Sequence, residues 1–275
     1  MPFEIPSSVE TQLREIATPW GTLYGLPMDR IAQTILADGQ YEWAETAIVG
    51  LLLRSGATAI DVGANIGYYT ALFARLAGPQ GAVHSFEANP FTAAILARTK
   101  AANGWANVVV NNRAVGDAAS TIRVRAMDLG DELREGLNLG GWSLRPTSDG
   151  EWQVEMVTLD RYVREQQLGK LHLLKVDVEG YEPKVLQGAS ETLRKFHPYV
   201  IIEMRAEDDA ERRGCEQVLA QLMELDYVCC RIMKRPFPHF RTTGPEDFEG
   251  EKFHFNLLAL PAARYEEFAA SFNRR

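Results

Sequence analysis

The chain has 275 residues, 46% of them hydrophobic, with a formal net charge of −8 at pH 7 and a pI near 5.3. This length predicts one large domain with added elements, and the acidic balance opposes broad contact with nucleic acid, which needs clustered cations. Its cysteines form neither a disulfide framework nor paired zinc-ligand spacing, and the longest apolar stretch, 47–53, is too short to cross a bilayer. We therefore expect a soluble cytoplasmic protein with no nucleic-acid or membrane partner.

Residues 1–54 are predicted to form an N-terminal helical cap. Residues 1–40 mix prolines with one helical pattern at 28–37, and 41–54 has the pattern of a second amphipathic helix. Residues 55–275 are predicted to form the main domain.

The main domain begins with apolar, strand-like runs that alternate with helical ones. Strands are predicted at 59–62, 82–86 and 108–111, with helices ending at 76 and covering 90–103. Pro90 suits the first turn of its helix, and Gly104 suits its end. This alternation is typical of a parallel sheet.

The run Ala59–Thr70 predicts a buried strand that breaks into a glycine turn and opens a helix. Gly63 and Gly67 permit tight turning and close approach of a ligand, and the helix would offer unpaired N–H groups and its positive dipole end. Asn65 stands where a dinucleotide fingerprint carries its second glycine, which argues against a nicotinamide-dependent oxidoreductase. The Asp61 carboxylate suits a ligand with a cationic or hydroxylated end better than a diphosphate. An ordinary tight turn is the structural alternative.

Two further acidic residues follow the next predicted strands. Glu87 can accept hydrogen bonds from both hydroxyls of a ribose, or only interact with the dipole of the next helix. Asp117, in the run Ala114–Asp117, can hold an adenine edge together with backbone groups, or serve only within a turn.

A short antiparallel excursion is predicted at 120–127 and 154–157, where apolar and charged residues alternate. Residues 128–150 between them form a glycine-rich connection longer than compact domains usually keep. We interpret this connection as a lid, and a plain flexible excursion is the alternative.

The alternation then resumes, with helices predicted at 159–168, 182–196 and 209–225 and strands at 171–177, 199–203, 227–232 and 255–260. The last two strands predict an antiparallel hairpin that closes a seven-stranded sheet. The carboxyl ends of parallel strands share one edge, where open sheets bind ligands. Residues predicted to gather there are Asp61, Glu87, Asn112, Asp177 and Glu203. The connection 234–253 leaves from that edge and is a second candidate wall of the substrate pocket.

Three carboxylates crowd one end of the run Leu173–Glu182, beside a glycine. Asp177 and Glu179 are candidate bases or metal ligands, and Glu203 on the neighbouring strand is the third catalytic candidate. A divalent cation there would be magnesium or calcium, because no cysteine–histidine cluster is available, but a metal is not predicted. The structural alternative is that Glu179 caps the next helix and Lys175 neutralises a neighbour.

Histidines and helical apolar residues complete the survey. His172 and His254 flank strands and titrate near neutral pH, but we interpret each as structural. Val185, Leu186 and Leu193 recur at helical spacing and are interpreted as core residues.

Taken together, these motifs resemble the FkbM family of S-adenosylmethionine-dependent methyltransferases. The resemblance covers about residues 57–204, and its motifs are specific only in combination. They are Asp61–Thr70, Phe86–Pro90, Ala114–Asp117, Leu174–Glu182, Val185–Ala189 and Ile202–Glu203.

The resemblance implies an α/β protein with a Rossmann-like seven-stranded methyltransferase fold and S-adenosylmethionine as cofactor. It implies an O-methyltransferase acting on a hydroxyl of a sugar, polyketide or related small-molecule acceptor. Residues 1–50 and 205–275 match weakly and, with 128–150, would choose that acceptor. A non-catalytic module that binds an adenosyl ligand is the alternative from another class. The cofactor-binding candidates are Asp61, Gly63, Ala64, Asn65 and Gly67 around the methionine part, Glu87 at the ribose, and Ala88 and Asp117.

Overall fold

The computed structural model describes residues 5, 7–124, 152–233, 239–244, 247 and 252–272. The predicted lid, 128–150, lies outside these residues, as does part of the predicted wall 234–253. No helix in the described part of the chain is long and apolar enough to span a membrane.

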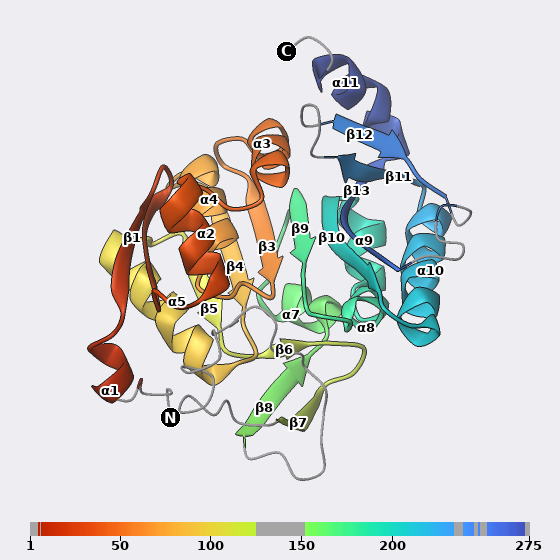
Figure 1. Cartoon of the computed structure of the whole chain (residues 1–275). Coiled ribbons are helices and arrows are strands. Elements are labelled where there is room, and N and C mark those ends of the chain that lie inside the picture. Colours follow the sequence, from red (N-terminus) through yellow and green to blue (C-terminus); the bar gives the residue numbers. More distant parts are fainter. Residues whose placement is uncertain are drawn as a thin grey trace.

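The described residues form helices and strands in alternation from β3 to α5 and again from α7 to β11 (Figure 1). The first half comprises α1 (Ser7–Glu10), β1 (Arg14–Thr18), β2 (Gly21–Gly25), α2 (Arg30–Asp38), α3 (Trp43–Leu52), β3 (Thr58–Val62), α4 (Tyr68–Ala77), β4 (Ala82–Phe86), α5 (Pro90–Asn103), β5 (Val108–Asn111), β6 (Ala114–Val115) and β7 (Ser120–Val124). The second half comprises β8 (Trp152–Val157), α7 (Leu159–Glu165), β9 (Leu173–Val176), α8 (Glu182–Gln187), α9 (Ser190–Phe196), β10 (Tyr199–Ala206), α10 (Asp209–Glu224), β11 (Tyr227–Met233), β12 (His239–Thr242), β13 (Phe253–Pro261) and α11 (Ala262–Phe272).

Within the described residues, the central sheet has eight strands in the order β12-β11-β13-β10-β9-β3-β4-β5. The five strands from β10 to β5 are parallel. Every residue of β3 and β9 is buried, because helices cover both faces of a parallel sheet. The predicted parallel sheet is confirmed.

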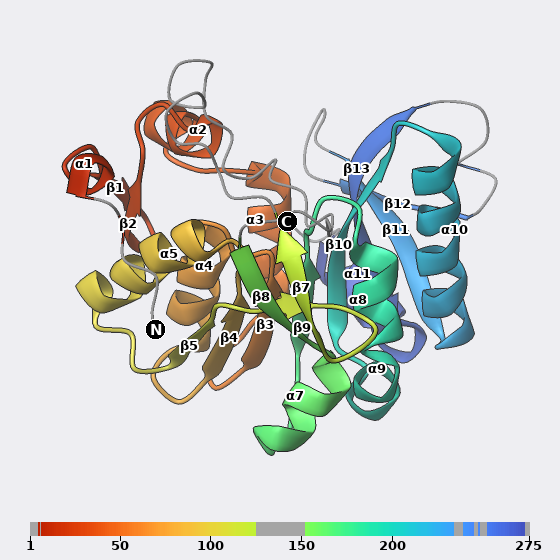
Figure 2. The ribbon, with the colours of Figure 1, turned by 90° about the horizontal axis from the view of Figure 1, so that it is seen from below.

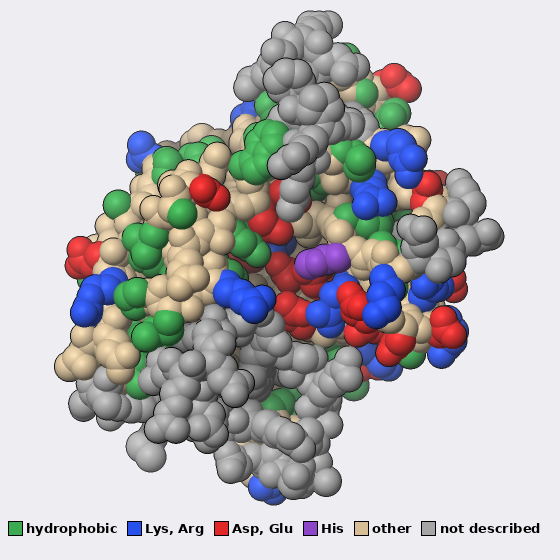
Figure 3. Space-filling view, viewed as in Figure 1, with side chains coloured by type: hydrophobic (Ala, Val, Ile, Leu, Met, Phe, Trp, Pro, Cys, Tyr) green, Lys and Arg blue, Asp and Glu red, His purple; other side chains and the backbone are tan. Residues whose placement is uncertain are grey.

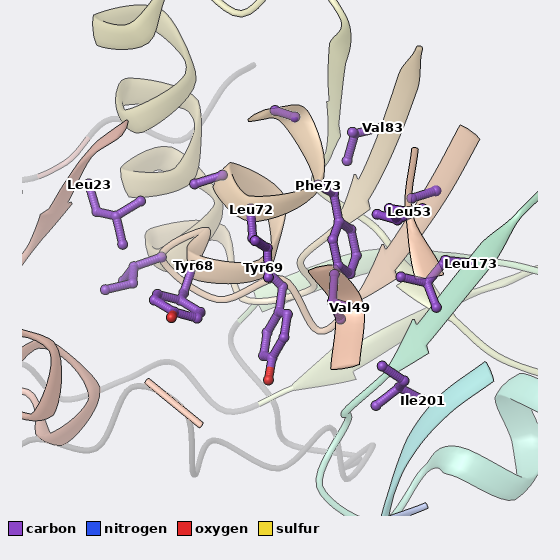
Figure 4. Packing of buried hydrophobic residues seen from close by; sticks show 14 of the residues in the cluster. Leu23, Val49, Leu53, Tyr68, Tyr69, Leu72, Phe73, Val83, Leu173 and Ile201 are labelled. Atoms are coloured by element: carbon purple, nitrogen blue, oxygen red, sulfur yellow. The ribbon is translucent and has the colours of Figure 1, made fainter. Parts of the chain in front are cut away.

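Two hydrophobic cores cover the two faces of this sheet, and successive strand residues alternate between them. Ala59 and Leu173 belong to the core under α3 and α4, whereas Ile60 and Leu174 belong to the core under α7, α8, α9 and α10. Figure 2 shows α4 and α5 on one side of the strands and α7 on the other. In Figure 4, Phe73 of α4 packs toward Leu53 and Leu173 in the first core.

The predicted antiparallel closure is confirmed and contains one strand more than expected. β13 lies between β10 and β11 and runs antiparallel to both. β12 then pairs with β11 and adds an eighth strand from within the segment predicted as a wall. As a result, β13 brings His254 and Asn256 beside the parallel strands.

The segment before residue 55 contains a β-hairpin as well as the predicted helices. β1 and β2 pair antiparallel and pack on α5, where the Tyr24 N–H donates to Thr99 Oγ1 at 3.0 Å. α2 and α3 confirm the two predicted helices. Ile16 and Leu23 of the hairpin belong to the first core, so this segment shares the core of the main domain.

The predicted antiparallel excursion is confirmed, because β7 and β8 pair antiparallel in a small sheet with β6. The single helix predicted at 182–196 is wrong, since it is broken into α8 and α9 at Gly188. A Cβ at Gly188 would lie 2.0 Å from the Gly116 carbonyl oxygen. This close approach fixes the chain after β6 against the break between the helices.

Candidate active site

A cavity of about 290 Å³ opens beside the carboxyl ends of β3, β4 and β9. Acidic side chains gather in a hollow of this face, beside basic ones and a histidine (Figure 3). Residues of α2 that sequence reasoning did not assign to a site also form its wall. The lining residues are Arg30, Ile31, Thr34, Tyr41, Val62–Ile66, Tyr68, Tyr69, Phe86–Ala88, Arg113, Lys175, Asp177–Glu179, Glu203 and His254.

The glycines of the turn after β3 are required by close packing. Gly63 has φ +81°, and a Cβ there would lie 1.8 Å from the carbonyl oxygen of Asp177. Gly67 has φ +99°, and a Cβ there would lie 2.5 Å from Leu96 Cδ1. Asn65 adopts φ +50°, a left-handed conformation that asparagine tolerates better than most residues. The turn therefore lets the β3 and β9 loops touch, which brings Asp177 beside it.

The backbone N–H groups of this turn are engaged within the protein. Each N–H of residues 63–67 has an acceptor at 2.6 to 2.9 Å. The acceptors are the Phe86 carbonyl for Gly63 and Ala64, Glu87 Oε2 for Asn65, Asn65 Oδ1 for Ile66 and the Ala64 carbonyl for Gly67. Residues 63–67 thus offer a ligand a shaped surface without free N–H donors.

Glu87 directly follows β4 and lines the cavity. Its Oε2 accepts from the Asn65 N–H and its Oε1 from the Asn89 N–H, at 2.8 and 2.9 Å. Burial raises the pKa of Glu87 to about 7, although these N–H donors oppose the shift. Since a carboxylate offers about four lone-pair sites, Glu87 keeps capacity for two ligand hydroxyls.

Two predicted cofactor contacts, Asp61 and Asp117, do not line the described cavity. Asp61 is fully buried beneath the turn, where its Oδ2 accepts from Thr70 Oγ1 at 2.7 Å. Burial raises the pKa of Asp61, and Lys175 opposes that shift. Asp117 instead forms an ion pair with Lys184, at 2.6 Å. Asp61 therefore supports the turn from behind, and Asp117 ties β6 to α8.

Two other predicted positions, Gly67 and Asn112, are also absent from the described lining. Gly67 serves as the N-cap of α4, and Asn112 donates to the carbonyls of Glu87 and Ala88. Their contribution to the site is to hold the turn and the end of β4 in place.

The three predicted catalytic carboxylates meet at one end of the cavity. Oxygen atoms of Asp177, Glu179 and Glu203 lie within 4.8 Å of one another. Burial raises the pKa of Glu179 to about 7, and the charges of Glu203 and Asp177 add to the shift. Glu179 has φ +55°, which turns it back toward the cavity after β9.

Each of these carboxylates has a basic partner. Lys175 Nζ lies 2.8 Å from Asp177 Oδ2, and Arg205 Nη1 lies 2.9 Å from Glu179 Oε2. His254 Nε2 lies 2.6 Å from Glu203 Oε1, and this hydrogen bond raises the pKa of His254. Charges of both signs therefore alternate around this end of the cavity.

Sequence reasoning missed the contribution of α2 and interpreted His254 as structural. His254 lines the cavity, whereas His172 Nδ1 accepts from the Thr58 N–H at 3.0 Å, and burial lowers the pKa of His172. A second cavity shares Thr34, Tyr41 and His254 with the first. It extends toward Trp43 and Asn256. No periodic pattern in the sequence could reveal this second cavity. Its two walls, residues 34–43 and 254–256, lie more than half the chain apart.

A polar bridge joins α3 to β13 below the second cavity. Asn256 Nδ2 donates to Glu42 Oε1 at 2.9 Å and to Glu45 Oε1 at 3.0 Å. The Tyr69 hydroxyl donates to Glu42 Oε2 at 2.8 Å, and in Figure 4 it points away from the apolar core. These bonds anchor the segment before residue 55 to the last strand of the sheet.

The sheet order, with antiparallel β13 inserted beside β10, and the glycine turn after β3 define a Rossmann-like methyltransferase fold. Residues 61–229 match the family described as the methyltransferase FkbM domain. The chain therefore belongs to the FkbM family of S-adenosylmethionine-dependent methyltransferases, and the predicted family and fold are confirmed.

Similar proteins include the 31-O-demethyl-FK506 methyltransferase FkbM of Streptomyces tacrolimicus, 32% identical over 232 residues, which are 74% of this chain and 81% of that protein. Protein-L-isoaspartate O-methyltransferase 1 of Archaeoglobus fulgidus is 29% identical over 133 residues, 44% of this chain and 60% of that protein. The solved structure of methyltransferase FkbM from Methylobacillus flagellatus is 15% identical, with a TM-score of 0.48, covering 92% of this chain and 57% of that one.

Proposed function

We propose that this protein transfers a methyl group to a hydroxyl oxygen of a small-molecule acceptor, such as a sugar, a polyketide or a related metabolite. The observation that carries the proposal is the cluster of Asp177, Glu179 and Glu203 at one end of the cavity. A hydroxyl must lose its proton as it is methylated, and a carboxylate at the cavity end can accept it. Two similar proteins, the 31-O-demethyl-FK506 methyltransferase and protein-L-isoaspartate O-methyltransferase 1, are also named for methylation at oxygen.

The cofactor would lie along the cavity, from Glu87 toward the carboxylate cluster. Glu87 would accept hydrogen bonds from the two ribose hydroxyls, next to Ala88 at the nucleoside end. The methionine part would lie against Gly63, Ala64 and Asn65. Bound there, S-adenosylmethionine supplies an electrophilic methyl group on a sulfonium. The acceptor would enter from the second cavity, past Tyr41 and His254.

Positioning and proton removal are the contributions of the protein to the reaction. Alignment of two reactants in one cavity can supply roughly 7–11 kcal/mol, and a general base adds about 10²- to 10⁴-fold. S-adenosylmethionine would supply the methyl group and leave as S-adenosylhomocysteine, and a carboxylate of the cluster would accept the proton of the acceptor hydroxyl. Glu179 suits this role best because its pKa of about 7 lies near the operating pH, while Asp177 is engaged in the ion pair with Lys175.

The carboxylate cluster also has oxygen ligands at a spacing that a divalent cation could use. However, Lys175, Arg205 and His254 already provide basic partners for its three members. A protein base therefore explains the cluster better than a metal ion does.

Calorimetric titration with S-adenosylhomocysteine tests the cofactor site, with a nicotinamide cofactor as the control. We expect micromolar binding of the former alone, lost in Glu87→Ala. Incubation with S-adenosylmethionine and a panel of hydroxylated metabolites, followed by mass spectrometry, then identifies the acceptor. Methylation at only nitrogen or carbon atoms in that panel would contradict the proposal. A failure of the protein to bind S-adenosylhomocysteine would contradict it as well.

A further inference from the structure

Three cationic residues line the first cavity, and they differ in what they contact. Lys175 is paired with Asp177 at 2.8 Å, and Arg113 Nε lies 3.0 Å from Glu155 Oε2. Arg30 is exposed and has no side-chain hydrogen bond or ion pair among the residues that the structure describes. Among the Lys and Arg side chains of the described cavity lining, Arg30 is therefore the one available to a ligand.

The first turn of α2 holds Arg30 beside the glycine turn. Asp29 caps the helix, accepting from the Ala32 N–H at 3.0 Å, and is fully buried. A Cβ placed on Gly25 would lie 3.4 Å from both Ala32 Cβ and Ile66 Cδ1, so the start of α2 and the turn pack against the same point. Ile31 and Thr34 line the cavity with Arg30, which shows that this face of α2 forms the wall.

An anionic ligand group in this cavity needs such a cation. Glu87, Asp177, Glu179 and Glu203 all line it, and they would repel a carboxylate. The N–H groups of residues 63–67, which often bind anions in such turns, are already engaged within the protein. A guanidinium presents paired donors that match a carboxylate.

We infer that Arg30 binds the α-carboxylate of the methionine part of the cofactor. This inference rests on the proposed function and extends the cofactor site to α2, outside the matched residues 61–229. The α-amino group would then face the acidic side of the cavity. The N-terminal segment would thus recognise the cofactor directly, besides covering the site.

Calorimetry of Arg30→Gln with two probes tests the inference. The probes are S-adenosylhomocysteine and its decarboxylated analogue, which keeps the nucleoside, the thioether and the amine. We expect the variant to bind S-adenosylhomocysteine about 10- to 100-fold more weakly, as for loss of a charge-assisted hydrogen bond, and the analogue within about twofold of wild type. Arg30→Lys should recover part of the loss.

Arg113→Gln is the matched control. It removes a cation that lines the same cavity but is already paired with Glu155. It should leave the affinity ratio of the two probes unchanged. If Arg30→Gln weakens both probes equally, or neither, the inference is overturned while the cofactor site stands. If wild type does not bind S-adenosylhomocysteine at all, the proposed function fails first.

Discussion

The ammonium of Lys175 lies directly behind the carboxylate of Asp177, with Nζ 2.8 Å from Oδ2 and 4.5 Å from the centre of the Tyr69 ring. The Lys175 side chain is 3% exposed and that of Asp177 is 26% exposed. Burial alone would lower the pKa of Lys175, but Asp177, Asp61 and Glu42 together raise it. The buried cation thus forms an ion pair with a carboxylate at the edge of the cavity.

Replacing this cation should cost stability. Lys175→Met leaves Asp61 buried without its counter-charge and should lower the free energy of unfolding by about 3–5 kcal/mol. Urea denaturation followed by circular dichroism measures the loss. The double variant with Asp177→Asn should lose less than the sum of the two single variants, because the pair is coupled. Additive losses would contradict this coupling.

The carboxylate cluster should affect turnover more than cofactor binding. Glu179→Gln and Asp177→Asn should each lower kcat by about 10²- to 10⁴-fold, since proton removal and its electrostatic support are lost. Release of S-adenosylhomocysteine with an identified acceptor measures the rate, and calorimetry measures the dissociation constant, which should change little. Glu191→Gln on the exposed surface is the matched control. An unchanged rate would remove the substituted residue from the mechanism.

Cofactor affinity should depend on pH through Glu87. The folded-state pKa of Glu87 is raised to about 7, and ribose hydroxyls bind the ionised form better. Binding therefore favours proton loss, so affinity for S-adenosylhomocysteine should fall by up to about tenfold per unit as the pH drops below 7, and level off above it. Titrations in buffers with different ionisation enthalpies would also detect the released proton. Glu87→Gln should bind weakly with no such slope.

The glycine turn should tolerate no side chain at Gly63. In Gly63→Ala, a Cβ 1.8 Å from the Asp177 carbonyl adds overpacking to left-handed strain, and the stability loss should reach about 2–4 kcal/mol. Gly39→Ala is the matched control, since φ is +74° there but no atom lies within 4 Å of the added Cβ. It should cost only about 1 kcal/mol. Equal shifts in the thermal midpoint would show that strain alone acts at Gly63.

Chelation should leave the rate unchanged. Because each carboxylate of the cluster has a basic partner in the protein, treatment with EDTA is expected to have no effect on turnover, and added Mg²⁺ none either. Loss of activity with EDTA, restored by Mg²⁺, would instead assign Asp177, Glu179 and Glu203 to a metal site.

The parallel part of the fold could be predicted because its strands are short and mostly apolar and alternate with helices, one of which begins with a cap of known chemistry. Asn89 accepts from the N–H groups of Phe91 and Thr92, and Pro90 follows it, so α5 begins where the sequence indicates. The β1–β2 hairpin and β12 were missed because they are short and only weakly alternating. The break at Gly188 depends on contact with Gly116, which no local pattern records.

The place of a residue in the cavity lining was predictable where one strand end supplies it, as for Glu87 and Asp177. Asp61 was assigned to the ligand because its motif is read along the chain. In three dimensions its side chain points under the turn toward Thr70. Arg30 on α2 and Tyr41 after that helix lie far from the motifs in the sequence, and their place in the cavity follows only from how this segment packs.

The position of β13 has a consequence for how the molecule is assembled during synthesis. β11 precedes β13 in the chain, yet the place beside β10 belongs to β13, so β11 must wait or move aside until residues 253–261 arrive. Pairings of this kind span long stretches of chain and slow folding. Because the same strand brings His254 and Asn256, the walls of both cavities are completed only after residues 253–261 have been made.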